Sequence, residues 1–235
     1  MSYLLPILLA LWGCDAPAPP PVVDEYPAAA RRVTFATLEG LGPHRLDARI
    51  TRTTQVEGAP PTEEDEAISL RWQDADHWQV TRRRGGKPVT EVRAWEGRAW
   101  LYTRGGAPVL HADAEPFRAA LAAEWDPWTT ALGAYADHLG LREVSQELVE
   151  GRMAHVYALE LLDGEAGKGQ EVERVEGRVW IDELTAVRLV GDLQVDARHR
   201  GRVRSVRLRF AVVEIGGDPG VEPPPGIVDS EGKSP

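Results

Sequence analysis

TAVRLVGDLQVDARHRGRVRSVRLRFAV, the sequence of residues 185–212, alternates apolar and polar residues with a period of two over most of its length. Successive side chains of a β-strand point to opposite faces of the sheet, so this alternation predicts two half-buried antiparallel strands, Thr185–Asp196 and Val206–Val212. Arginines and aspartates occupy most of the solvent-facing positions. His199-Arg200-Gly201 separates the two strands and predicts the turn of a β-hairpin.

A second meander of short strands precedes this hairpin. Asp74-Ala75-Asp76, Gly85-Gly86 and Glu96-Gly97 have the composition of hairpin turns. The alternating segments that these turns separate are Ala67–Trp72, Trp78–Arg84, Pro88–Trp95 and Arg98–Thr103. Residues 67–103 are therefore predicted to form an antiparallel sheet.

The last of these turns also predicts a register. A two-residue loop at Glu96-Gly97 sets the cross-strand pairs of the strands on either side of it. The pairs are Val92–Leu101 and Ala94–Ala99 on one face, and Arg93–Trp100 and Glu91–Tyr102 on the other. The first face is expected in the core, and the second carries aromatic side chains that another part of the protein can cover.

Residues 113–139 follow a different period. Apolar residues recur there at steps of three or four, as on one face of a helix. They are Phe117, Leu121, Trp125, Trp128, Leu132, Tyr135 and Leu139. Because proline costs about 3 kcal/mol inside a helix but is favoured at its first position, Asp126-Pro127 predicts two helices or one sharp kink, with Asp113 and Asp126 as N-caps. A further helix is expected from about Pro27 to Glu39.

Cys14 is the only cysteine of the chain and follows a short apolar run. Leu4–Leu11 has the length of a signal-peptide core and is too short for a membrane-spanning helix of about 20 residues. Leu11-Trp12-Gly13-Cys14 resembles the box at which bacterial lipoproteins are cut and acylated. This resemblance implies that residues 1–13 are a signal peptide and that Cys14 carries diacylglycerol and an N-acyl chain such as palmitate. The alternative is a secreted or cytosolic protein with a stray cysteine.

The resemblance to lipoproteins also implies a location and an order of segments. The mature chain is expected in the bacterial cell envelope, anchored to a membrane through Cys14 and facing the periplasm or the cell surface. Residues 14–26 are a proline-rich tether, residues 27–215 a single domain, and residues 216–235 a disordered Pro/Gly-rich tail. The formal net charge of −10 argues against nucleic acid as a partner and against adsorption to anionic lipid.

The order of expected elements resembles that of the curved-sheet envelope lipoproteins and lipoprotein carriers of the LolA and LppX type. Trp95–Tyr102 is similar to one of their hairpins, and Gly177–Asp182 is similar to the segment that opens their C-terminal meander, although Thr185-Ala186 stands where that family has glycine. The resemblance covers about residues 27–215. It implies an α+β fold in which N-terminal and mid-chain helices cover a strongly curved antiparallel sheet, a half-barrel of about ten strands. It also implies an apolar cavity that holds acyl chains or a lipidated protein.

Six residues are candidates for the lining of such a cavity. They are Trp95, Trp100, Tyr102, Leu121, Trp125 and Trp128. The leading hypothesis is a carrier of a hydrophobic or lipidated ligand, and the alternative is a module that docks on another envelope protein. A carrier requires an apolar cavity of a few hundred Å³, whereas a docking module requires a packed interior and an exposed apolar patch.

No catalytic residue, metal site or cofactor site is predicted, so the chain is not expected to be an enzyme. The six histidines are scattered, and no His-Glu-x-x-His, Gly-x-Ser-x-Gly or glycine-rich phosphate loop occurs. Glu63–Glu66 lacks the alternating oxygen ladder of a calcium loop and is interpreted as a solvated loop. Arg82–Lys87 is interpreted as a hairpin tip and not as an RNA-binding segment.

Overall fold

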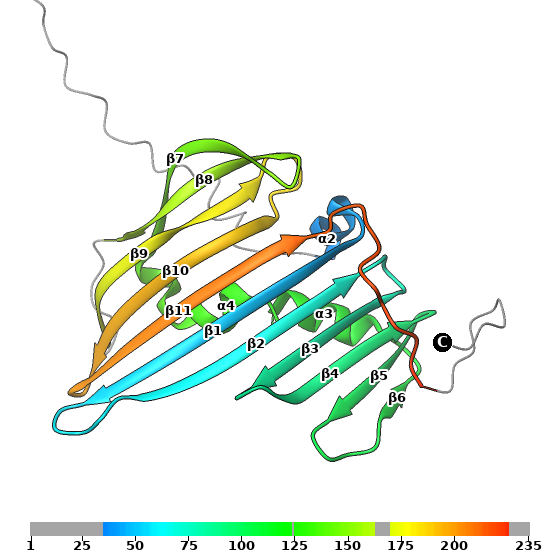
Figure 1. Cartoon of the computed structure of the whole chain (residues 1–235), viewed down its shortest axis with the longest axis horizontal. Coiled ribbons are helices and arrows are strands. Elements are labelled where there is room, and N and C mark those ends of the chain that lie inside the picture. The colour runs from blue at the N-terminus through cyan, green and yellow to red at the C-terminus, as the bar shows by residue number, and fades with distance from the viewer. Residues whose placement is uncertain (1–34, 124, 163–169, 226–235) are drawn as a thin grey trace, which may run out of the picture.

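The computed structural model of this chain describes residues 35–123, 125–162 and 170–225. Cys14, the predicted signal peptide, the predicted tether and most of the helix expected from Pro27 to Glu39 lie outside these ranges. The described elements form one open, curved antiparallel sheet of eleven strands, with short helices on one face (Figure 1). The α+β class and the curved sheet are thus confirmed, with eleven strands where about ten were expected.

Two meanders meet at the centre of the sheet. The first comprises β1 (His44–Val56), β2 (Thr62–Trp72), β3 (Trp78–Arg84), β4 (Lys87–Trp95), β5 (Arg98–Thr103) and β6 (Val109–His111). The second comprises β7 (Leu139–Val149), β8 (Arg152–Leu161), β9 (Gln170–Asp182), β10 (Arg188–His199) and β11 (Arg202–Val213). The first and last strands, β1 and β11, pair with each other along almost their whole length, so the spatial order is β6-β5-β4-β3-β2-β1-β11-β10-β9-β8-β7.

The helices lie together on one face of the sheet, which we call the inner face; the opposite face is the outer face (Figure 1). In the described ranges they are α2 (Phe35–Leu41), α3 (Glu115–Ala123) and α4 (Pro127–Leu132), followed by the 3-10 helix η1 (Gly133–His138). The expected break at Asp126-Pro127 is confirmed. Asp126 caps α4 by accepting hydrogen bonds from the Thr129 amide at 3.0 Å and the Thr129 hydroxyl at 2.7 Å, and Pro127 takes the first helical turn.

Three of the hairpin turns predicted from the sequence, Gly85-Gly86 among them, have two consecutive residues of positive φ, as such turns require. β4 and β5 pair in the expected register, with Val92 opposite Leu101 and Arg93 opposite Trp100. Glu96 and Gly97 both have positive φ, 49° and 74°, as a two-residue hairpin turn with the twist of its strands requires. The β10–β11 turn repeats this backbone at Arg200 and Gly201, with φ of 48° and 75°.

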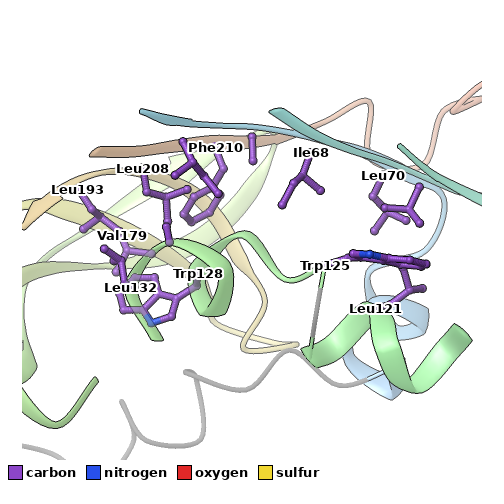
Figure 2. Close-up of a cluster of buried hydrophobic side chains, with 14 of the residues drawn as sticks. Ile68, Leu70, Leu121, Trp125, Trp128, Leu132, Val179, Leu193, Leu208 and Phe210 are labelled. Carbon is purple, nitrogen blue, oxygen red and sulfur yellow. The ribbon is translucent and has the colours of Figure 1, made fainter. Parts of the chain in front are cut away.

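The core lies between the inner face and the helices. Ile68 and Leu70 of β2 and Leu208 and Phe210 of β11 point from the sheet toward the aromatic residues of the helical region (Figure 2). Trp128 and Leu132 of α4 pack in the same cluster. These contacts explain the helical stripe found in the sequence, because one apolar face of each short helix rests on the sheet.

Two segments differ from the sequence expectation. Glu63–Glu66, interpreted as a solvated loop, belongs to β2, and Glu66 is 2% exposed on the inner face. Residues 216–225, expected in a disordered tail, lie as a strap across the outer face (Figure 1). The strap is held by arginines, because Arg71 Nη1 donates to the Gly220 carbonyl at 2.7 Å and Arg93 Nη1 contacts Glu222 at 3.4 Å. Residues 226–235 lie outside the described ranges.

Candidate functional site

An apolar cleft lies between the helices and the inner face. Its lining includes Leu38 of α2, Leu121 of α3, Trp125, Trp128 of α4, and Leu70 and Phe210 of the sheet. The free volume of the cleft is about 30 Å³. This volume suffices for a water-sized group and is far below the few hundred Å³ of a site for a small organic ligand. Side chains therefore fill the cleft in this structure.

Two charged residues face the same cleft. Arg188 of β10 and Asp126, the N-cap of α4, are 3% and 5% exposed, and Arg188 Nη2 donates to Asp126 Oδ1 at 3.0 Å. The Arg188 guanidinium also stacks over the ring of Trp128, with Cζ 5.1 Å from the ring centroid. Burial lowers the pKa of Arg188 from its usual value, and the charge and hydrogen bond of Asp126 oppose this shift.

The pair is incomplete on the arginine side. Arg188 Nη1 is buried and has no hydrogen-bond partner among the described residues. Asp126 cannot supply a second bond easily, because its other oxygen, Oδ2, already accepts from Thr129. A guanidinium has five N–H donors in a fixed fork, so a buried arginine that uses one strong acceptor has donor capacity left.

A second charged cluster, built around the buried carboxylate of Glu66 and two partly exposed arginines, holds the middle of α4 to the sheet. Glu66 receives Arg52 Nη1 at 2.7 Å on one oxygen and Arg82 Nε on the other. Arg52 Nη2 also donates to the Thr130 carbonyl of α4 at 2.9 Å. Burial raises the pKa of Glu66, but hydrogen bonds and charges from Arg82 and Arg52 outweigh this effect, so its pKa lies below the usual value.

The structure separates the six candidate lining residues into two groups. Leu121, Trp125 and Trp128 line the inner cleft. Trp95, Trp100 and Tyr102 do not line it, because they alternate along β4 and β5 with residues that pack in the core, and so point to the outer face. On that face the Arg93 guanidinium lies 5.5 Å from the centroid of the Tyr102 ring.

The outer face also carries a polar groove of about 790 Å³ beside the strap. Arginines from five strands line it, together with Asp47, Glu91 and Glu222. Most of these arginines have an acidic partner: Arg49 pairs with Asp65 at 2.6 Å, and Arg209 pairs with Asp192 at 3.2 Å. The groove is therefore a surface of compensated charge.

Exposed apolar side chains gather at one end of the sheet. Leu148 of β7 lies directly opposite Met153 of β8, and the Glu183 amide donates to the Met153 carbonyl at 3.0 Å, which brings Leu184 beside them. These residues are 70%, 44% and 85% exposed in the order Leu148, Met153, Leu184. We call them the rim patch. No sequence pattern predicts this patch, because its members come from three segments.

The part of the chain that the structure describes contains no cluster of three or more His, Cys, Asp or Glu side chains that could hold a metal ion. Within the same residues, no helix is long and apolar enough to cross a membrane. The buried histidine has a local role. His44 is hydrogen-bonded through Nδ1 to the Gly42 carbonyl at 2.7 Å, and burial lowers its pKa despite this bond.

No family model and no curated protein sequence matches this chain. Solved structures do. A LolA superfamily protein from Nitrosomonas europaea is 7% identical, with 76% of this chain and 93% of that chain covered and a TM-score of 0.23. A putative outer membrane lipoprotein-sorting protein domain from Vibrio parahaemolyticus is 11% identical, with 79% and 91% covered and a TM-score of 0.24.

The complex of MucA and MucB from Pseudomonas aeruginosa is a further match. It is 16% identical, with 89% of this chain and 59% of that chain covered and a TM-score of 0.28. At such identities no residue role carries over, so the site rests on the residues of this chain alone.

Proposed function

We propose that this chain is a non-catalytic binding protein of the bacterial envelope that docks a partner protein through the rim patch. The observation that carries this proposal is the filled inner cleft, with a free volume of about 30 Å³. A packed interior together with exposed apolar side chains is the combination that distinguishes a docking module from a carrier. Membrane attachment through acylated Cys14 belongs to the same proposal, since it would hold the domain close to envelope partners.

The charges around the rim patch define the chemistry of the partner. Glu150 and Glu183 are exposed beside the apolar residues of the patch. The one arginine of the β7–β8 turn, Arg152, is engaged by Asp182 through two bonds of 2.7 and 2.8 Å. A second copy of the same acidic patch would be repelled, as would anionic lipid. The partner is therefore expected to present apolar side chains flanked by Lys or Arg.

Site-specific crosslinking in living cells tests the docking proposal. A photoreactive residue at Leu184 should capture one defined envelope protein, whereas the same residue at Leu110 of β6, which is 53% exposed on the opposite end of the sheet, should not. Met153→Asp should abolish the crosslink from Leu184. Equal capture from both positions would contradict docking at the rim.

Membrane attachment has its own test. Cys14→Ser should prevent lipid labelling and release the protein from membrane fractions, because attached acyl chains contribute about 0.8 kcal/mol per buried CH₂. A Cys14→Ser variant that still pellets with membranes after alkaline washing would contradict anchoring through Cys14.

A carrier of an apolar ligand is the second candidate, and one observation favours it. The lining of the cleft is apolar apart from Asp126 and Arg188, and a few polar groups in an apolar site are typical of small-molecule binding. Ligand entry would require the side chains that fill the cleft to move. Native mass spectrometry of the Cys14→Ser variant purified from envelope extracts separates the candidates, because a carrier retains a non-covalent apolar ligand and a docking module does not.

A further inference from the structure

Charge is compensated unevenly in the outer-face groove. On the side of β1 and β11 its arginines have carboxylate partners, as Arg49 has in Asp65 at 2.6 Å. On the side of β2 and β3, Arg71 and Arg83 also line the groove, and neither has a carboxylate partner among the described residues. This side of the groove therefore has hydrogen-bond donors for an anionic group that the described part of the chain does not supply.

The register of β2 and β3 gives the spacing of these two arginines. Arg83 lies directly opposite Ala67, and Arg71 is four residues further along β2. At about 3.3 Å per residue, Arg71 and Arg83 are therefore separated by about 13 Å along the strand direction. The residues between them on this face have short side chains, with Ser69 opposite Thr81, so the floor of the groove is open to a segment that lies along it.

The strap shows what kind of segment the outer face binds. Residues 218–224 form neither helix nor strand, and they carry two acidic side chains, three prolines and no Lys or Arg. Arg71 Nη1 donates to the Gly220 carbonyl at 2.7 Å, and Arg93 Nη1 contacts the carboxylate of Glu222 and the carbonyl of Pro223, each at 3.4 Å. Arginines of the outer face thus already bind an acidic, proline-containing segment through its carbonyls and a carboxylate.

We propose that the outer-face groove binds an acidic extended segment of a partner protein, with two carboxylates four residues apart on Arg71 and Arg83. Side chains four residues apart in an extended chain lie on the same side and about 13 Å apart, which matches the spacing of the two arginines. Each guanidinium can bind a carboxylate through parallel hydrogen bonds. Arg71 can do so without release of the strap, because Gly220 uses only one of its five donors.

Two observations favour a peptide over an anionic membrane as the occupant of the groove. The formal net charge of −10 opposes adsorption of the whole protein to anionic lipid. The groove, of about 790 Å³, lies beside the strap and admits a single extended segment more readily than a flat bilayer surface. The inference goes beyond docking at the rim patch, which is a separate surface with acidic surroundings, so either can fail without the other.

Fluorescence anisotropy with three labelled peptides and the Cys14→Ser variant tests the inference. The first peptide has two glutamates four residues apart among glycine, proline and serine. The second has its two glutamates two residues apart, and the third has glutamines in place of the glutamates of the first. The first peptide should bind saturably and about fivefold more tightly than the second, which corresponds to one exposed ion pair of about 1 kcal/mol. The third should bind more weakly than either.

Two neighbouring arginines provide matched variants. Adding Arg83→Gln should weaken binding of the first peptide about fivefold and remove its advantage over the second. Adding Arg84→Gln instead makes the same change of net charge at an exposed residue outside the groove, and it should leave binding unchanged. Equal losses in the two variants would assign binding to net charge and overturn the inference.

The remaining outcomes are equally decisive. Equal binding of the three peptides, or no binding of the first, would overturn the inference. Binding to phosphatidylglycerol vesicles that is lost in Arg83→Gln, with no binding of any peptide, would overturn it in favour of a membrane surface. Met153→Asp, in the rim patch, should leave peptide binding unchanged, so failure of the groove as a peptide site leaves docking at the rim untouched.

Discussion

Two charged clusters, each built around a buried carboxylate, hold α4 to the sheet, and they differ in completeness. In the first, both oxygens of Glu66 receive an arginine, and Arg52 continues to the Thr130 carbonyl of α4. In the second, Arg188 binds the N-cap Asp126 through one nitrogen and leaves the other buried without a partner among the described residues. A polar cluster stabilises the packing of a helix on a sheet when all of its hydrogen bonds are satisfied. The incomplete one has capacity for a further group.

The loss of a buried charge should therefore have different consequences in the two clusters. Removing Glu66 from the closed cluster leaves Arg52 and Arg82 without a partner, so the cost falls on stability. Removing both members of an open pair can be nearly neutral for stability, and the cost then falls on whatever the open donor binds. Substitutions in the Glu66 cluster should therefore lower stability more than binding in the inner cleft. Substitutions of the Arg188–Asp126 pair should lower binding there more than stability.

Glu66→Ala should have the largest effect on stability. It leaves Arg52 and Arg82 without their shared partner and should lower the free energy of unfolding by about 3–4 kcal/mol in urea denaturation. Glu64→Ala, at an exposed position of the same strand, should change it by less than about 0.5 kcal/mol. Similar losses of unfolding free energy in the two variants would show that the Glu66 cluster does not stabilise the fold.

Arg188→Met should cost somewhat less, about 2–3 kcal/mol, because Asp126 stays buried but keeps its hydrogen bonds from Thr129. The double variant Asp126→Asn/Arg188→Met should recover most of this loss and come within about 1 kcal/mol of the unsubstituted protein. The coupling between the two positions, measured as a double-mutant cycle, is the quantity of interest. If the losses of unfolding free energy in the two single variants simply add in the double variant, the two residues do not compensate each other, and the pair is not replaceable.

The pH dependence of stability should show two steps, one from His44 and one from the carboxylates of Glu66 and Asp182. Burial lowers the pKa of His44 below 6.5, so between its folded and unfolded pKa values the unfolded chain binds more protons, and stability falls as the pH drops through about 6.5. The pKa values of Glu66 and Asp182 are also lowered in the folded protein, which adds stability above about pH 4.5 that is lost at lower pH.

Thermal unfolding between about pH 3 and pH 8 measures both steps. His44→Phe, which keeps an aromatic ring beside Trp72, should remove the step near neutral pH and leave the acid step in place. Persistence of the upper step in His44→Phe would assign it to another group.

Leu184→Asp should have the smallest effect on stability, less than about 0.5 kcal/mol, because the Leu184 side chain is 85% exposed. If Leu184 is part of a docking surface, the same change should nevertheless abolish partner capture. A large loss of stability would show that Leu184 belongs to the fold and not to a surface for partners.

Local patterns determined much of this fold. The alternation around Glu96-Gly97 predicts the register of β4 and β5 to the residue, and Asp126-Pro127 predicts the break between α3 and α4. Both depend on neighbours within a few residues in sequence, because a two-residue turn fixes a hairpin and a proline fixes a helix start. The helical stripe likewise predicts three cleft residues, Leu121, Trp125 and Trp128.

Other features of the fold depend on the pairing of strands that are distant in sequence. In the sequence Glu66 belongs to an acidic run typical of a solvated loop, and only the pairing of β1, β2 and β3 shows that Arg52 and Arg82 flank it. Trp95, Trp100 and Tyr102 lie on the outer face, away from the inner cleft, and alternation alone does not say which face of a sheet the helices cover.

The strap of residues 216–225 has no local signal, because the arginines that bind it are more than a hundred residues away in the chain. The cluster of Arg188 and Asp126 is equally remote in sequence, and neither residue stands out from the charges around it. The elements and their local registers could thus be predicted from the sequence, because they depend on residues that are near neighbours in the chain. Only the packing of distant strands and helices decided where the buried charges meet.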